Sequence, residues 1–112
     1  MLKMFGYFVD KSDCVHHRIF PGVDIYTACG EQMMFSLVEM EPHAVVEEHS
    51  HPHEQMGLML EGAADFTIGG KQQRVTAGQM WQIPGGVVHK VVALDQPVRA
   101  LDVFHPPRDD YR

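Results

Sequence analysis

Residues 49–55, HSHPHEQ, constrain this chain more than any other stretch. On an extended strand, side chains two positions apart point to the same face, so His49 and His51 are expected to project together. Gln55 has the same parity and can add a carbonyl oxygen. Imidazole nitrogens and one oxygen form a ligand set suited to Zn, Fe, Mn, Ni or Cu. A solvated loop would carry the same residue types, so this stretch alone leaves a metal site and a surface loop equally open.

A second segment, residues 78–89 (GQMWQIPGGVVH), has the pattern of a strand, a Pro-Gly-Gly turn and a histidine that opens the next strand. The two segments resemble the two motifs of the cupin superfamily, G-x5-H-x-H-x3-E-x6-G and G-x5-P-x-G-x2-H. The first motif runs on to Gly62. The resemblance implies a divalent transition metal bound inside the protein, and the positions that match its ligands are His49, His51, Gln55 and His89.

Three positions depart from the motifs. His43 stands where the first motif has glycine, and Ala93 stands where the second often has asparagine. Gln55 replaces the usual glutamate, so all four protein ligands would be neutral and a divalent ion would keep its full double charge. Such an ion is a stronger Lewis acid, and its site attracts anions. The alternative is a lost or weakened metal site.

The chain is expected to be all-β, because it shows many short strand patterns and no sustained helical periodicity. A hairpin is expected at Gly69-Gly70, since glycine accepts positive φ. The cupin resemblance implies a single-domain antiparallel jelly-roll β-barrel over residues 1–112, with its core at about 33–104. The expected strands are residues 1–9, 25–28, 33–40, 45–49, 56–60, 64–68, 72–76, 79–83, 89–94 and 98–104.

Composition limits the classes of partner. The 112 residues carry a net charge of −6 and no run of Lys or Arg, which argues against nucleic acid and against an anionic membrane surface. An anionic substrate would need a local positive site. A chain this short would gain buried surface from a homodimer.

Cys14 and Cys29 lie outside both motifs, and without an export signal we expect reduced thiols and a cytoplasmic protein; a disulfide between them is the less favoured alternative.

The last part of the chain offers acid–base and anion-binding groups. In residues 98–104, strand parity puts Asp102 and Phe104 on one face. A buried carboxylate needs a partner, and near a cation Asp102 could act as an acid–base group; the alternative is a structural bond to the backbone. Arg108 follows two prolines and could bind a substrate carboxylate in a bidentate fashion. On parity alone, an exposed tail is the favoured alternative for Arg108.

This tail resembles the C-terminal motif of the KdgF-like cupins of pectin and alginate breakdown. Those enzymes open and ketonise 4,5-unsaturated monouronates, and the resemblance implies that Asp102, Phe104 and Arg108 line a catalytic pocket here. It therefore implies a metal-dependent enzyme acting on a small anionic substrate, such as a sugar acid. Two alternatives stay open: a metal-dependent dioxygenase of a small organic substrate, since imidazole also suits Fe(II) and Cu(II), and a non-catalytic small-molecule-binding cupin. His53 is expected at the rim of the site.

Overall fold

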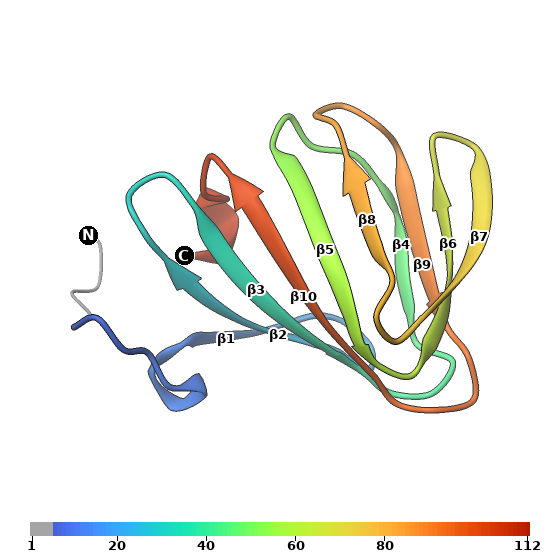
Figure 1. Cartoon of the computed structure of the whole chain (residues 1–112), viewed down its shortest axis with the longest axis horizontal. Coiled ribbons are helices and arrows are strands. Elements are labelled where there is room, and N and C mark those ends of the chain that lie inside the picture. The colour runs from blue at the N-terminus through green and yellow to red at the C-terminus, as the bar shows by residue number, and fades with distance from the viewer. Residues whose placement is uncertain (1–5) are drawn as a thin grey trace.

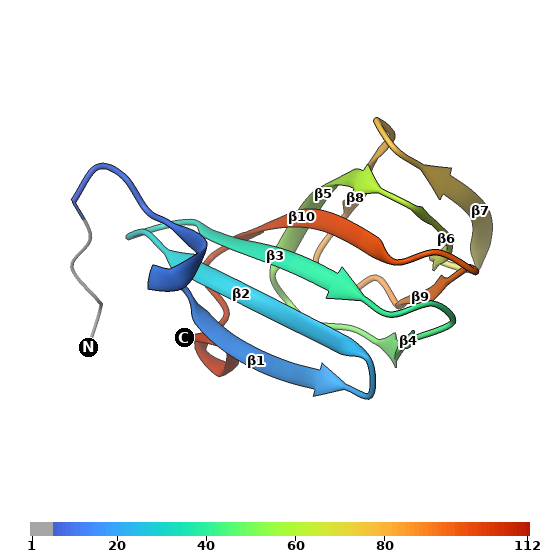
Figure 2. The ribbon, with the colours of Figure 1, turned by 90° about the horizontal axis from the view of Figure 1, so that it is seen from below.

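The computed structural model describes residues 6–112, which form two antiparallel β-sheets that face each other, as Figure 1 and Figure 2 show from two directions. The strands are β1 (Val15–Phe20), β2 (Val23–Cys29), β3 (Met34–Met40), β4 (Val45–His49), β5 (Glu54–Glu61), β6 (Ala63–Ile68), β7 (Lys71–Thr76), β8 (Met80–Ile83), β9 (His89–Ala93) and β10 (Val98–His105). Two short 3-10 helices, η1 (Lys11–Asp13) and η2 (Asp109–Tyr111), flank the sheets in sequence.

The larger sheet has the order β1-β2-β3-β10-β5-β8, and the smaller has the order β4-β9-β6-β7. Strands far apart in the chain are therefore neighbours, and the last strand, β10, lies between β3 and β5. The inward side chains of both sheets form one apolar core, because alternate residues of each strand point to the same face. This arrangement is the antiparallel jelly roll that the sequence led us to expect.

The expected strands from residue 25 onward are confirmed, most of them to within one or two residues at each end. Two differences lie at the start of the chain. Residues 6–9 are irregular rather than part of a lead strand, and residues 1–5 lie outside the described part. Strand β1 was not predicted, because its two histidines and an arginine hide the alternation; pairing with β2 holds it in place.

The hairpin predicted at Gly69-Gly70 is confirmed between β6 and β7. Gly69 and Gly70 both have positive φ, at 57° and 80°. His43, which stands where the cupin motif has glycine, also has a positive φ of 66°. A side chain in this left-handed region is strained by about 1–2 kcal/mol. The position thus keeps the conformation that glycine would supply, although the residue is different.

Within residues 6–112, no helix has the length and apolar character needed to cross a membrane.

Replacing His43 with glycine is expected to raise the free energy of unfolding by up to about 1 kcal/mol, because relief of the left-handed strain exceeds the entropy that glycine loses on folding. Urea denaturation measures the change. The matched control is His43→Val, which should lower the free energy of unfolding, since β-branched residues tolerate positive φ worst. Equal stability of the two variants would contradict the assigned conformation.

Candidate metal centre

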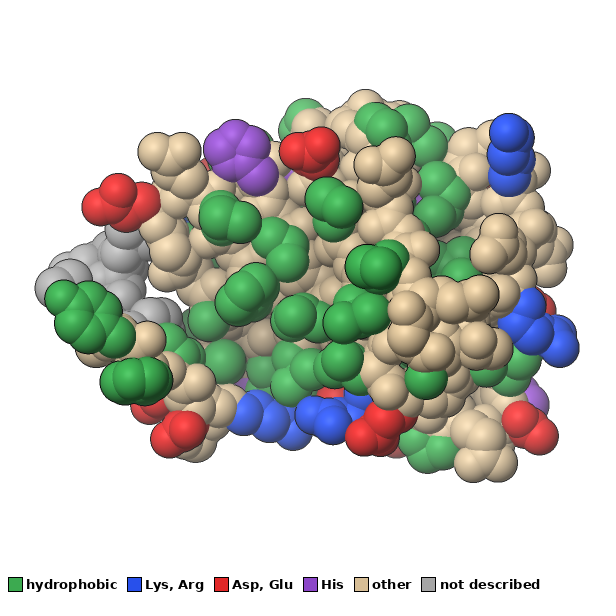
Figure 3. Space-filling view, in the orientation of Figure 1, with side chains coloured by type: hydrophobic (Ala, Val, Ile, Leu, Met, Phe, Trp, Pro, Cys, Tyr) green, Lys and Arg blue, Asp and Glu red, His purple; other side chains and the backbone are tan. Residues whose placement is uncertain are grey.

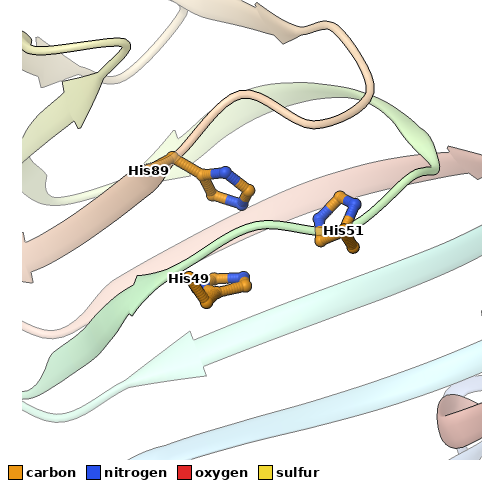
Figure 4. Close-up of side chains that lie close together, drawn as sticks. All are labelled: His49, His51 and His89. Atoms are coloured by element: carbon orange, nitrogen blue, oxygen red, sulfur yellow. The ribbon is translucent and has the colours of Figure 1, made fainter.

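Three of the predicted ligands meet between the two sheets. His49 ends β4 and His89 begins β9, and the two residues lie directly opposite each other in the antiparallel ladder. His51 comes from the loop after β4, just beyond the strand end. Figure 4 shows the three rings turned toward one another, and one nitrogen from each lies within 4.8 Å of the others. The structure therefore brings together side chains that are 40 positions apart in the sequence.

Backbone carbonyls fix the tautomer of all three rings. The Nδ1 atoms of His49, His51 and His89 lie 2.8, 3.1 and 2.9 Å from the carbonyl oxygens of Glu47, His53 and Val87, respectively. A carbonyl only accepts hydrogen bonds, so each Nδ1 carries the proton and donates it. Each Nε2 is then an unprotonated acceptor available to a metal, which is how ligating histidines are commonly oriented in proteins.

Burial favours the uncharged form of two of these rings, His51 and His89. Loss of solvent lowers the pKa of His51 to about 4, and the nearby positive charge of Arg108 adds to this effect. Burial also lowers the pKa of His89. The His89 Nε2 atom is buried and has no hydrogen-bond partner. A buried acceptor without a partner costs free energy, and a metal ion would remove that cost.

Gln55 turns its side-chain oxygen toward the same place. Its Oε1 atom lies 3.1 Å from the His51 Nε2 atom, while its side chain also hydrogen-bonds to Asp102. Since the carboxylate accepts, the Gln55 amide donates to Asp102 and leaves Oε1 facing His51. Two acceptors this close repel each other unless a cation lies between them. The donor set of three neutral imidazoles and one amide oxygen therefore fits a divalent transition metal.

Asp102 lies beside this cluster on the inner face of β10. It is 9% exposed, and the indole Nε1 of Trp81 donates a hydrogen bond to its carboxylate at 3.0 Å. Burial raises the pKa of Asp102 to about 6, and the bonds from Gln55 and Trp81 oppose this rise only in part. A side-chain network replaces the structural bond to the backbone that was the alternative. Asp102 can therefore gain or lose a proton near neutral pH.

Gly57 makes room for this network. It lies opposite Trp81 across β5 and β8, and a β-carbon at Gly57 would overlap the indole ring. Trp81 packs in the core against Phe66. Its polar end also fixes Asp102, which the sequence did not indicate.

Arg108 is buried rather than part of an exposed tail. It is 9% exposed, and its guanidinium lies 4.0 Å from the ring centre of Tyr111 and 5.4 Å from that of Phe104. Asp110 accepts two hydrogen bonds from it, the shorter at 2.9 Å. The exposed-tail alternative is therefore wrong, and the positive charge of Arg108 lies near the three-histidine cluster.

The tail that carries Arg108 is tied to β1 and β2. The carbonyl oxygen of Tyr111 accepts hydrogen bonds from Thr27 Oγ1 at 2.6 Å and from the His17 ring at 3.1 Å. Neither contact could be found from the sequence, because both join residues more than 80 positions apart. His53 lies next to His51, with ring centres 5.4 Å apart, and stays outside the three-histidine cluster.

One cavity joins these groups. Its lining combines polar side chains with apolar ones such as Ile25, Val38 and Ile83. The polar lining residues are Ser36, His49, Gln55, His89, Asp102, Arg108 and Tyr111. The cavity therefore offers a cation, a titratable carboxyl and two of the three clustered histidines, His49 and His89, to one small molecule.

Comparison with known proteins agrees with this geometry. Residues 36–104 match the family described as Cupin domain. The chain belongs to the cupin family. Among solved structures, this cupin is similar to KdgF from Halomonas sp., with 28% identity, a TM-score of 0.85, and coverage of 95% of this chain and 98% of the other. An RmlC-like cupin from Shewanella frigidimarina, at 22% identity and a TM-score of 0.87, shares the fold over 96% and 97% of the two chains.

Two curated relatives match part of the chain. The uncharacterized protein SCO3923 of Streptomyces coelicolor is 27% identical over 67% of this chain and 71% of its own length. The oxalate decarboxylase OxdC of Bacillus subtilis, an enzyme with Mn(II) centres, is 31% identical over 60% of this chain but only 19% of its own length. Enzymes are thus present among the relatives of this cupin.

The raised pKa of Asp102 predicts a stability change that depends on pH. In metal-free protein, Asp102→Asn should raise the free energy of unfolding at pH 7.5 by up to about 3 kcal/mol, because folding then no longer buries a charge. A folded pKa above the unfolded value lowers stability as pH rises from about 4 to 6. Near pH 4 the carboxyl is protonated in the folded protein, so the stability gained by Asp102→Asn should vanish there.

Urea denaturation followed by the fluorescence of Trp81, the single tryptophan, measures both values. Asp95→Asn, at an exposed turn, is the matched control and should show no such pH dependence. A gain of equal size at both pH values would contradict the raised pKa.

Proposed function

We propose that this cupin is a metal-dependent enzyme that opens and ketonises 4,5-unsaturated monouronates. The observation that carries the proposal is that a buried Arg108 and a buried, titratable Asp102 line the same cavity as His49, Gln55 and His89, three of the four side chains that would hold the metal. The similarity to KdgF over nearly the whole of both chains supports it. The expected single domain, homodimer and cytoplasmic location stay predictions.

Arg108 would bind the substrate carboxylate. Its guanidinium already donates two hydrogen bonds to the carboxylate of Asp110, an arrangement that a substrate carboxylate could reproduce. The Asp110 side chain is 59% exposed, so it can turn into solvent when a substrate takes its place. Phe104, which lies against Arg108 and His51, would pack on the sugar and exclude water.

Asp102 would transfer the proton. Ring opening of the substrate releases an aldehyde at C1 and an enol at C5, and ketonisation moves the enol proton to C4. With a pKa of about 6, Asp102 can hold a proton and exchange it at neutral pH. A divalent metal bound by His49, His51, Gln55 and His89 would supply Lewis acidity that stabilises the negative oxygen formed in this step.

A dioxygenase is the second candidate. Three neutral imidazoles also suit Fe(II) or Cu(II), and the geometry of the cluster does not choose among the metals. A non-catalytic binding cupin is the third. The buried titratable Asp102 favours catalysis over simple binding, since a pure binding pocket gains nothing from a carboxyl with a pKa near neutrality.

The decisive experiment incubates metal-loaded protein with unsaturated galacturonate and mannuronate monomers, following double-bond absorbance and dissolved oxygen together. Loss of absorbance without oxygen uptake is the expected result. Oxygen uptake would select the dioxygenase, and no change in either signal would select the binding protein.

Asp102→Asn should lower kcat by about 100-fold to 10,000-fold, the usual contribution of a positioned acid–base group, while metal content per chain stays unchanged. Product formation and metal analysis on the same sample measure both. Asp95→Asn, at an exposed turn, is the matched control and should keep full activity. Full activity of the Asp102 variant would remove Asp102 from the mechanism.

Gln55→Glu should keep or strengthen metal binding and raise KM for the anionic substrate by about tenfold, because a negative ligand lowers the positive field at the cavity. Metal titration and steady-state kinetics give the two quantities. Gln82→Glu makes the same change at an exposed position of β8 and should alter neither. An unchanged KM in the Gln55 variant would mean that ligand charge does not attract the substrate.

A further inference from the structure

The ion pair between Arg108 and Asp110 differs from the other arginine pairs in where its two members lie. The Arg108 side chain is 11% exposed, whereas that of Asp110 is 59% exposed. In the other ion pairs of residues 6–112 the arginine side chains are between 37% and 62% exposed. Figure 3 shows basic side chains of this surface kind along the lower edge of the molecule, some of them directly beside acidic ones. Asp110 instead reaches a buried cation from the solvent side.

Aromatic rings hold the guanidinium of Arg108 in place without help from Asp110. Its Cζ atom lies 4.0 Å from the ring centre of Tyr111 and 5.4 Å from that of Phe104, and a guanidinium stacks favourably on such rings. The backbone around it is fixed as well, because the carbonyl oxygen of Tyr111 accepts hydrogen bonds from side chains of β1 and β2. Asp110 can therefore leave Arg108 by rotating its own side chain, and no movement of the backbone is needed.

Asp110 neutralises Arg108 when the cavity holds no ligand. The two hydrogen bonds that the Arg108 side chain donates within the described part of the chain both go to Asp110, from Nε at 3.3 Å and from Nη2 at 2.9 Å. Asp102 lies in the same cavity, but its side chain bonds to Gln55 and Trp81 instead. Since a buried cation without a partner is costly, Asp110 stabilises the empty cavity.

A ligand carboxylate would meet Arg108 at an occupied position. The Nε and Nη2 atoms form an edge of the guanidinium that matches a carboxylate through two parallel hydrogen bonds. Asp110 already uses both atoms, so a second carboxylate cannot bind this edge at the same time. Two carboxylates beside one cation also repel each other. Binding through this edge therefore requires that Asp110 moves away.

We propose, on the basis of the carboxylate-binding role that the proposed function gives to Arg108, that Asp110 is an internal competitor that sets the affinity of the cavity for carboxylates. Asp110 takes no part in proton transfer and acts only through Arg108. A ligand carboxylate offers Arg108 the same two bonds and displaces Asp110. A neutral ligand leaves Asp110 in place, so the competition acts on anionic ligands alone.

Isothermal titration calorimetry of the zinc-loaded full chain with D-galacturonate tests the proposal, because this saturated sugar acid has the carboxylate but no double bond to react. Asp110→Asn should lower the dissociation constant about tenfold, since a partly buried two-bond ion pair contributes on that scale. The dissociation constant for D-galactose, which lacks the carboxylate, should not change. Unchanged galacturonate binding would overturn the proposal, and so would weaker binding, which is expected if Asp110 serves to position Arg108.

The matched control is Asp109→Asn, which removes the same charge from the neighbouring residue of η2. The Asp109 side chain is 93% exposed and pairs with Arg112 at 2.9 Å. Its variant should bind galacturonate within about twofold of the wild type, because water and salt screen an exposed charge. A tenfold gain here as well would reduce the effect of Asp110 to general charge repulsion and overturn the proposal.

A double-mutant cycle determines whether Asp110 acts through Arg108. In the Arg108→Gln background, Asp110→Asn should no longer tighten galacturonate binding, because the cation for which the two carboxylates compete is gone. The contribution of the zinc ion is common to all the proteins in the cycle and cancels. An undiminished gain in this background would overturn the proposal. Circular dichroism verifies that each variant is folded.

Carboxyl-carbon NMR of the zinc-loaded wild type provides a test that needs no variant. At neutral pH, saturation with D-galacturonate should move the Asp110 carboxyl signal toward that of the exposed Asp109, whose own signal should stay constant. A constant Asp110 signal would mean that Asp110 remains on Arg108 in the complex, and it would overturn the proposal.

These measurements separate the competitor role from the proposed enzyme activity, because none of them depends on turnover. Galacturonate binding that responds to Asp110, in a protein inactive on unsaturated uronates, would support the competitor role and remove the proposed function. Turnover of those uronates together with galacturonate binding that is indifferent to Asp110 would keep the proposed function and remove the competitor role.

Discussion

The site depends on three short hydrogen bonds from histidine Nδ1 atoms to backbone carbonyls two residues before or after each ring. These bonds belong to the local backbone, so the fold itself fixes the tautomers and aims three Nε2 lone pairs at one point. Burial then keeps His51 and His89 neutral. The buried Nε2 atom of His89 has no hydrogen-bond partner, and the His51 Nε2 and Gln55 Oε1 acceptors face each other. Both arrangements cost free energy, and a bound cation would remove that cost. Cation binding would therefore explain why a polar cluster lies inside an otherwise apolar jelly roll.

Gln55 links the three-histidine cluster to the buried carboxyl of Asp102. One side-chain amide has its oxygen near His51 and bonds to Asp102, so the charge at one site acts directly on the other. Trp81 holds Asp102 from the opposite side, in space that Gly57 leaves open. The ligand cluster, the carboxyl and the indole thus form one connected network, in which a change at any member alters the others.

Sequence reasoning predicted most of the fold and the central site because both depend on local patterns. Strand alternation placed Asp102 and Phe104 on the inner face of β10, and two short motifs identified the ligands that the structure brings together. Strand β1 was not predicted because His16, His17 and Arg18 are three consecutive polar residues that interrupt the alternation of apolar and polar side chains. The burial of Arg108 and the anchoring of Tyr111 by Thr27 depend on contacts between distant parts of the chain, which no local pattern encodes.

Strand β10 presents two sets of side chains at alternate positions. Asp102 and Phe104 line the cavity, and Leu101 and Val103 lie on the exterior. An irregular pairing with β5 between Arg99 and Ala100 sets this register before Asp102. Inserting or deleting one residue downstream would exchange the two sets, filling the cavity with leucine and valine and putting the carboxyl outside. Length variation among relatives should therefore be tolerated in the loops around β10 and excluded from the strand itself.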